Sequence, residues 1–211
     1  TPRLYQQVIA AKASQKNTLV VLPTGLGKTV VSLMVALQRL KVHPTKKILI
    51  MAPTKPLASQ HLESFKKLLA NIVPEEQMVL FTGAVAPAKR AALFTTCQII
   101  FSTPQGLEND VLASRIRLKD ISLMVFDESH RATGEYSYVW LAKQYVKQAD
   151  NPLILGLTAS PGADRDTIQE VLDNLSIEQI EYRESTAPDV KPYLKETKLE
   201  WSLYISLQLI H

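Results

Sequence analysis

The sequence has little that would crosslink it or anchor it in a membrane. It has one cysteine, no apolar run long enough to span a bilayer, and no apolar signal-peptide region at its N-terminus. Cys97 cannot form an internal disulfide and has no metal-ligand companions, and the apolar residues after it are typical of a buried strand. We therefore expect a structural cysteine, a reducing cytoplasmic setting and no membrane partner.

A strong charge of one sign is also absent. The formal net charge is +4, from 24 Lys and Arg against 20 Asp and Glu. This excess is compatible with nucleic-acid binding but is common in soluble domains, and the basic pairs at 46–47, 66–67 and 89–90 favour solvated helix faces. The chain does not begin with Met and ends in an apolar stretch, so we expect a fragment cut from a longer protein.

The 211 residues, 46% of them hydrophobic, suit one α/β domain plus a short appendage. Nearly continuous apolar runs predict strands at 18–22, 47–52, 78–81, 98–101, 123–126 and 153–157. Helical patterns lie between and after them, at 28–40, 56–69, 87–94, 105–113, 138–148 and 164–175. This alternation predicts a mostly parallel sheet flanked by helices. From about Ser185 a polar, Pro-containing linker begins, and the alternation at 199–205 predicts one more strand.

A phosphate-binding loop is predicted between the first strand and the first helix of that list. Glycines let the backbone turn its N–H groups inward, the helix N-terminus adds its positive dipole end, a lysine reaches the β- and γ-phosphates of ATP, and a hydroxyl ligates Mg²⁺. The loop residues are Thr24, Gly25, Leu26, Gly27, Lys28 and Thr29. The general pattern has glycine where this chain has Leu22, and a dinucleotide fingerprint would need a third glycine where it has Val30.

Two carboxylates, Asp127 and Glu128, follow the apolar strand at 123–126. Carboxyl ends of parallel strands gather on one edge of a sheet, so these acids are expected beside the phosphate loop. There Asp127 is suited to hold Mg²⁺ and Glu128 to deprotonate the attacking water, which makes Lys28, Asp127 and Glu128 the candidate catalytic residues. The alternative is a strand-end turn with solvated acids, and the phosphate loop argues against it.

Together these residues resemble the motifs of superfamily 2 helicases, whose second motif reads Asp-Glu-x-Asp or Asp-Glu-x-His; here Ser129 stands at the usual Ala position and His130 ends the motif. The resemblance implies a RecA-like phosphate-loop domain. It assigns adenine recognition to Arg3 and Gln6, and coupling of nucleotide to nucleic acid to His130, Thr158 and Ser160. It assigns nucleic-acid contacts to Pro53, Thr54, Lys55, Thr82, Gly83, Thr103 and Pro104. Taken singly, several of these fit helix caps, turns or, for Gln6, a solvated helix residue. Their order along the chain, each at the end of a predicted strand, carries the argument.

The wording of the motifs, for example at 22–29, 52–57 and 156–162, resembles the Hef and FANCM branch. That resemblance implies ATP-driven remodelling of forked or branched DNA through backbone contacts, near the nucleoid. RIG-I-like and Dicer enzymes, which act on double-stranded RNA, have similar motifs and remain an alternative.

Such motors close ATP between two RecA-like domains, and the second domain supplies arginine fingers. After Ser160 only Arg165 and Arg183 remain. We therefore divide the chain into an ATP-binding domain at 1–184 and, at 185–211, a linker and strand leading to a second domain that this chain lacks. We expect weak nucleotide binding and poor turnover. Two competing functions are a non-hydrolysing binding module, disfavoured by the intact loop and acids, and a metabolic phosphoryl transferase, disfavoured by the motif at 158–160 and the lack of a lid segment.

Overall fold

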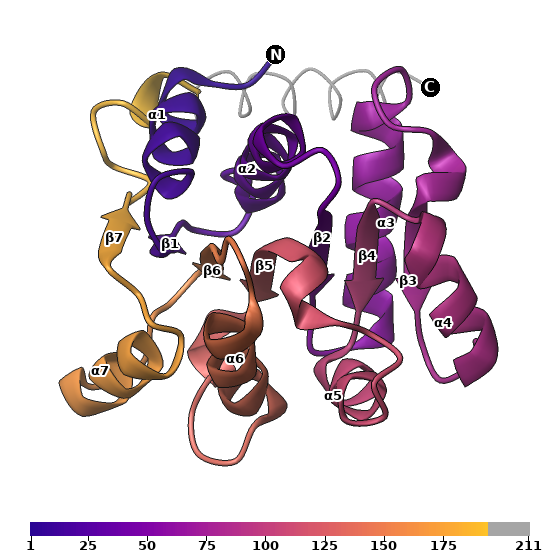
Figure 1. The fold of residues 1–211 in the computed structure, drawn as a ribbon. Coiled ribbons are helices and arrows are strands. Elements are labelled where there is room, and N and C mark those ends of the chain that lie inside the picture. The colour runs from indigo at the N-terminus through magenta and orange to yellow at the C-terminus, as the bar shows by residue number, and fades with distance from the viewer. Residues whose placement is uncertain (194–211) are drawn as a thin grey trace, which may run out of the picture.

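The computed structural model describes residues 1–193, so the strand predicted at 199–205 lies outside the described residues. Seven strands form one sheet in the order β3-β4-β2-β5-β6-β1-β7, and every neighbouring pair is parallel (Figure 1). The strands are β1 (Thr18–Val21), β2 (Lys47–Met51), β3 (Met78–Phe81), β4 (Ile99–Ser102), β5 (Ile121–Asp127), β6 (Ile154–Thr158) and β7 (Gln179–Tyr182). The predicted α/β class and parallel sheet are confirmed.

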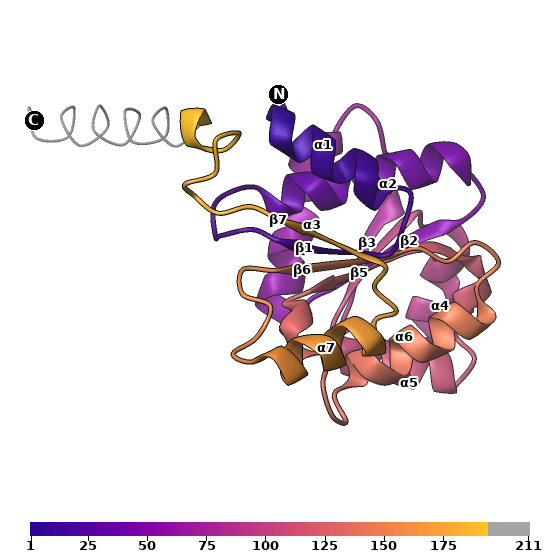
Figure 2. The same ribbon diagram turned by 90° about the vertical axis from the view of Figure 1, so that its left-hand side faces the viewer.

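Helices cover both faces of the sheet, with α1, α2 and α3 on one side and α4, α5, α6 and α7 on the other (Figure 2). They are α1 (Leu4–Ala13), α2 (Lys28–Val42), α3 (Lys55–Leu69), α4 (Pro87–Thr96), α5 (Pro104–Leu112), α6 (Ser137–Gln148) and α7 (Arg165–Asn174). Short 3₁₀ turns are η1 (Glu75–Gln77), η2 (Leu118–Asp120) and η3 (Ser129–Arg131). No helix among residues 1–193 is long and apolar enough to cross a bilayer.

The period-two alternation of the strands divides the core into two clusters. Along β5, Leu123 and Val125 pack on the α1–α3 side, whereas Met124 and Phe126 pack on the α4–α7 side. Phe126 meets the ring of Tyr138 edge-on, with the ring centroids 5.0 Å apart. Because both faces of the central strands are buried, side chains useful for chemistry are left to the strand ends and the loops that follow them.

Among the described residues every predicted strand and helix is present, with ends that differ by at most two residues. Two elements were not predicted: the N-terminal helix α1 and the edge strand β7. Arg3 and Gln6 consequently lie at the start of a helix, so the expectation that every motif follows a strand was wrong for this one. Cys97 is 1% exposed, and burial raises the pKa of its thiol to about 11 against the opposing charge of Lys47, which confirms a structural cysteine.

Candidate nucleotide-binding site

Three neighbouring strands end side by side at the candidate site. β6 lies between β1 and β5, with Val21 of β1 paired to Thr158 of β6 and Asp127 of β5 paired to Leu157 of β6. The loop after β1, the acids after β5 and the hydroxyls after β6 are therefore brought to one edge of the sheet, as the sequence predicted.

The loop after β1 has the backbone that its glycines predict. Gly25 and Gly27 have φ angles of 85° and 84°, a region that favours glycine, and the N–H of Leu26 donates to the carbonyl of Pro23 over 3.2 Å. Gly27 caps α2, so Lys28 and Thr29 open that helix. A side chain at position 27 would be conformationally strained, and its Cβ, 2.2 Å from Nε2 of Gln6, would displace the Gln6 amide.

The N-terminal helix holds this loop in place. The hydroxyl of Tyr5 and the amide Nε2 of Gln6 both donate to the carbonyl of Leu26, over 2.7 and 3.1 Å. The backbone N–H of Arg3 donates to Oε1 of Gln6 over 2.9 Å. Gln6 is 4% exposed, so the alternative of a solvated helix residue was wrong. Its role in reading adenine, like that of Arg3, stays a prediction.

Two hollows meet at Gly25 and Gly27. One, of about 340 Å³, is polar and is bordered by Thr24, Gly25, Gly27, Lys28, Thr29, Leu57, Gln60, His61, Ser64, Asp127 and Glu128. The other, of about 540 Å³, is more apolar and is bordered by residues 1–3, Gln6, Gly25, Gly27, Val30, Leu33, Leu37, Leu68, Leu69 and Ile72. Except for Leu26, whose side chain is buried, every nucleotide, metal and catalytic residue predicted from the sequence borders one of the two.

Lys28 reaches across the polar hollow. Its Nζ donates to the carbonyl of Leu22 over 3.0 Å, and the side chain is half-buried. Desolvation lowers the pKa of Lys28 from its usual value, and the nearby carboxylates of Asp127 and Glu128 oppose this shift. The ammonium is therefore short of charged partners at hydrogen-bond distance, and an anion in the hollow would supply them.

Asp127 is held by two side chains that the sequence analysis did not single out. Nε2 of His61, on α3, lies 2.8 Å from Oδ2 of Asp127, and the hydroxyl of Tyr138, on α6, donates to the Asp127 carbonyl over 2.7 Å. Tyr138 also lies 3.3 Å from the carbonyl of Met51 at the end of β2. Both residues come from elements distant in sequence, so no local pattern could indicate them.

Glu128 adopts the left-handed conformation, with φ at 51°, and starts the turn η3. This conformation is uncommon for a residue with a side chain and costs about 1–2 kcal/mol. Glu128 borders the polar hollow with 34% of its side chain exposed. Behind it, the hydroxyl of Ser129 donates to the carbonyl of Leu157 over 3.1 Å, so a serine is accommodated at this motif position.

The three residues assigned to coupling form one chain of contacts. Nδ1 of His130 lies 2.9 Å from Oγ1 of Thr158 and 3.4 Å from a carboxylate oxygen of Glu128. The Thr158 hydroxyl donates to the carbonyl of Ser160 over 2.6 Å. The ends of β5 and β6 are thus joined through side chains beside Glu128, the candidate catalytic base.

The residues assigned to nucleic-acid contact follow β2, β3 and β4, on the other half of the same edge. Thr54, Lys55 and Gly83 are exposed, whereas Thr82 and Pro104 are buried. Thr54 caps α3 by accepting from the N–H of Leu57 over 3.4 Å. Pro53 and Thr103 are partly exposed.

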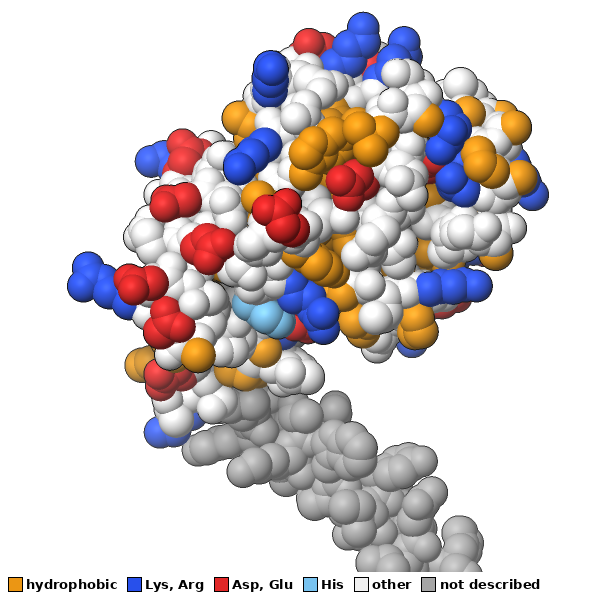
Figure 3. Space-filling view, turned by 90° about the horizontal axis from the view of Figure 1, so that it is seen from below, with side chains coloured by type: hydrophobic (Ala, Val, Ile, Leu, Met, Phe, Trp, Pro, Cys, Tyr) orange, Lys and Arg blue, Asp and Glu red, His pale blue; other side chains and the backbone are white. Residues whose placement is uncertain are grey.

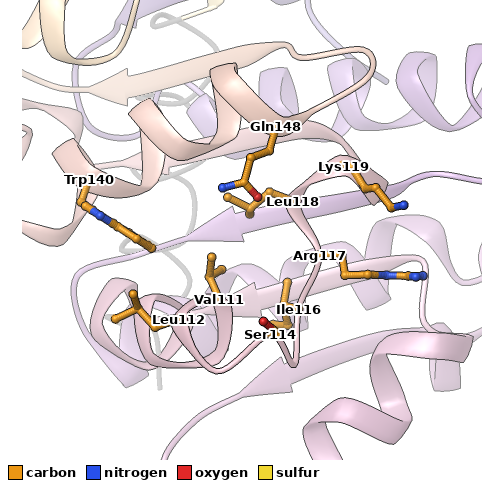
Figure 4. A pocket seen from close by; sticks show the side chains of 9 residues that line it. All are labelled: Val111, Leu112, Ser114, Ile116, Arg117, Leu118, Lys119, Trp140 and Gln148. Atoms are coloured by element: carbon orange, nitrogen blue, oxygen red, sulfur yellow. The ribbon is translucent and has the colours of Figure 1, made fainter.

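Charge and a further hollow lie outside this site. On the face seen in Figure 3, Lys and Arg are scattered among Asp and Glu rather than gathered in one field. A groove of about 570 Å³ between α5, η2 and α6 is bordered by Leu112, Arg117 and Trp140 among others, and none of the predicted site residues lines it (Figure 4). Within residues 1–193 no three His, Cys, Asp or Glu side chains gather to hold a metal ion without help from a ligand.

Comparison with known proteins gives a consistent family. The family model described as DEAD/DEAH box helicase matches residues 3–168. The chain is 38% identical over 198 residues to the DEAD-box ATP-dependent RNA helicase FANCM of Arabidopsis thaliana, covering 94% of this chain and 15% of that protein. It is 38% identical over 192 residues to the ATP-dependent DNA helicase mph1 of Neurospora crassa, covering 91% of this chain and 16% of that protein. The crystal structure of the Pyrococcus furiosus Hef helicase domain matches with 52% identity and a TM-score of 0.88, over 91% of this chain and 40% of that one.

Proposed function

Because this chain belongs to the DEAD/DEAH box helicase family of superfamily 2, we propose that it binds ATP and Mg²⁺ and forms half of a motor that remodels forked or branched DNA. The observation that carries the proposal is the convergence of Lys28, Thr29, Asp127 and Glu128 on one polar hollow beside a glycine-shaped loop. Phosphate loops of this kind present backbone N–H groups and a helix N-terminus to the β- and γ-phosphates.

The donor atoms in the hollow suit Mg²⁺. The hydroxyl of Thr29 and the carboxylate of Asp127 are hard oxygen ligands, and Mg²⁺ is commonly held by one or two such groups together with phosphate oxygens and water. The bound ion would neutralise charge on the transferring phosphate. In this proposal Lys28 binds the β- and γ-phosphates, and Glu128 orients and deprotonates the attacking water.

The polar and apolar hollows divide the nucleotide between them. The phosphates take the polar hollow, and the base takes the neighbouring apolar one, where Arg3 and Gln6 lie beside leucine side chains. Gln6 already donates to the carbonyl of Leu26 in the loop, so a base that bonds Gln6 would be linked through it to the phosphate loop.

The proposed nucleic-acid substrate is DNA, contacted along its backbone at Pro53–Lys55, Thr82–Gly83 and Thr103–Pro104. The fungal relative is named a DNA helicase and the plant relative an RNA helicase, so double-stranded RNA is the competing substrate. Residues 1–184 form the ATP-binding domain in this proposal, and residues 185–211 lead to a second RecA-like domain that supplies the arginine finger. We place the protein inside the cell, at the nucleoid.

The test measures nucleotide binding and ATP turnover by this chain, alone and with forked DNA, linear duplex DNA or double-stranded RNA. We expect binding that depends on Lys28, slow turnover because the arginine finger is proposed to come from the second domain, and the largest effect with forked DNA. Fast turnover without DNA would contradict the half-site proposal, and a preference for double-stranded RNA would favour the alternative substrate. Absence of nucleotide binding would favour a non-hydrolysing module.

A further inference from the structure

Helix α3 places a histidine against the carboxylate of Asp127. Nε2 of His61 lies 2.8 Å from Oδ2 of Asp127, and the two side chains are only 9% and 10% exposed. Within residues 1–193, His61 is the one side chain that hydrogen-bonds this carboxylate. The carboxylate of Asp127 is therefore bonded by a residue from a different element that borders the same hollow.

The hydrogen bonds of the His61 ring indicate that packing alone does not explain why a histidine occupies this buried position. A carboxylate oxygen accepts, so Nε2 of His61 donates to Asp127, and the other ring nitrogen, Nδ1, is left to bond elsewhere. Nδ1 is buried and has no hydrogen-bond partner among residues 1–193. An unpaired buried polar atom costs free energy that an apolar side chain of similar size would avoid. The favourable interaction of His61 at this position is therefore its hydrogen bond to Asp127.

The face of α3 that carries His61 is turned to the polar hollow. Leu57, Gln60, His61 and Ser64, at the i, i+3, i+4 and i+7 spacing of a single helix face, all border the polar hollow. His61 thus links α3 to the carboxylate that is suited to hold Mg²⁺.

We propose that His61 is a positioning residue, which fixes the Asp127 carboxylate for Mg²⁺ through its Nε2–H. The proposal rests on the function proposed above, in which Asp127 holds the metal. Partners that orient a metal-binding carboxylate typically change metal affinity by about tenfold or more when removed. Loss of the donor is therefore expected to weaken Mg²⁺-dependent nucleotide binding without weakening binding in the absence of metal.

Two substitutions separate the donor from the bulk of the ring. The amide nitrogen of His61→Gln reaches the position of Nε2, whereas that of the shorter His61→Asn reaches only the position of Nδ1. Leu62→Ala removes a buried side chain of the same helix that does not contact Asp127, and it serves as the control for general loosening of α3. Thermal unfolding followed by circular dichroism establishes first that each variant folds.

The readout is the fluorescence of N-methylanthraniloyl-ADP, titrated with each protein in EDTA and at increasing Mg²⁺. We expect the half-saturating Mg²⁺ concentration to rise about tenfold in His61→Asn. It should change less than about threefold in His61→Gln and in Leu62→Ala, and affinity in EDTA should be the same in all of these proteins.

Equal Mg²⁺ dependence of the Gln and Asn variants would overturn the proposal. So would a shift of the same size in Leu62→Ala, or a Gln variant that fails to fold while Leu62→Ala folds, since His61 would then act through packing. A parent chain that binds no nucleotide, or whose binding survives Lys28→Ala, would instead overturn the proposed function. The two failures are thus distinguishable.

Discussion

The two halves of the functional edge hold their charges in different ways. On the nucleotide half, Lys28 donates to a backbone carbonyl and Glu128 stays one-third exposed. On the half formed by β3 and β4, Asp110 of α5 is 1% exposed and is bonded by Arg90 over 2.6 and 2.7 Å and by Arg115 over 2.7 Å. On one half a buried carboxylate is bonded by two arginines, whereas on the other Lys28 bonds a backbone carbonyl and Glu128 stays open to solvent.

The paired half has a mechanical consequence. Besides Asp110, the Arg90 guanidinium donates to the carbonyl of Thr82 over 3.3 Å and to that of Val85. The loop after β3, which is proposed to touch nucleic acid, is therefore clamped to α5 through a buried ion pair. We interpret the half with the Arg90–Asp110 pair as structural, and the half with Lys28 and Glu128 as the one whose charges are available to a ligand. The following substitutions test this comparison.

The largest effect is expected from Asp110→Asn. Burial raises the pKa of the Asp110 carboxyl, but hydrogen bonds and charges from Arg90 and Arg115 outweigh this and lower it overall. A depressed folded pKa contributes stability above the unfolded value of about 3.9, and this contribution is lost as the pH falls through the folded pKa. Breaking the buried pair at pH 7 should cost about 3–5 kcal/mol in the free energy of unfolding, measured with urea.

The matched control for that experiment is Asp150→Asn, which removes an exposed carboxylate paired with Lys46 at 2.6 Å. Its Asp side chain is 60% exposed, so little change in the urea midpoint is expected. The deficit of Asp110→Asn relative to the parent should also shrink below pH 4, where the parent loses the same charge. A deficit that persists in acid would mean that the carboxylate contributes through shape rather than charge.

Lys28→Ala tests the nucleotide half of the edge. Removing a half-buried ammonium whose desolvation is only partly offset should leave thermal stability unchanged or slightly raised. Nucleotide affinity should fall about ten- to a hundredfold, because a charged hydrogen bond is worth about 1.5–3 kcal/mol. Isothermal titration with ATP and a thermal melt of the same sample measure both. A large loss of stability would show that Lys28 belongs to the structural half of the comparison.

The nucleotide loop could be predicted from sequence because its conformation is determined locally. Gly25 and Gly27 have the positive φ angles that the pattern requires, and Lys28 opens the helix as expected. The strands were predictable for a similar reason, since both their faces are buried and their sequences are apolar throughout. Helix α1 was missed because Gln6, Tyr5 and their neighbours show no clear apolar face in the sequence, and its burial comes from packing against α2.

The partners of Asp127 could not be predicted because they depend on tertiary structure. His61 comes 66 residues before it, and Tyr138 eleven residues after it, on a different element. Nothing in their local sequence distinguishes them from ordinary helix residues. The Arg90–Asp110 pair, separated by 20 residues, was likewise read as part of a solvated basic face at 89–90. For Arg90, which is 7% exposed, that interpretation was wrong.

Tyr138→Phe should have a smaller effect, on the support of the Asp-Glu box. The buried hydroxyl donates to the Asp127 carbonyl, and its removal leaves that acceptor without this donor. We expect a loss of about 1–2 kcal/mol in unfolding free energy, with the aromatic packing against Phe126 preserved. Urea unfolding measures it, with Tyr182→Phe on the exposed edge strand as control. An effect no larger than that of the control would show that the carbonyl is satisfied without Tyr138.

The smallest effect is expected from Thr158→Val, which keeps the side-chain shape but removes the bond to His130 and the one to the Ser160 carbonyl. These contacts join the ends of β5 and β6 through hydrogen bonds alone, so folding should change by only about 0.5–1.5 kcal/mol. The coupling between nucleotide binding and DNA binding should weaken, so the ratio of nucleotide affinities with and without forked DNA should move towards one. Thr158→Ser retains the hydroxyl and should retain that ratio. An unchanged ratio in Thr158→Val would mean that the halves communicate by another route. Helix α3 would be the next to test, because Thr54 caps it and its His61 bonds Asp127.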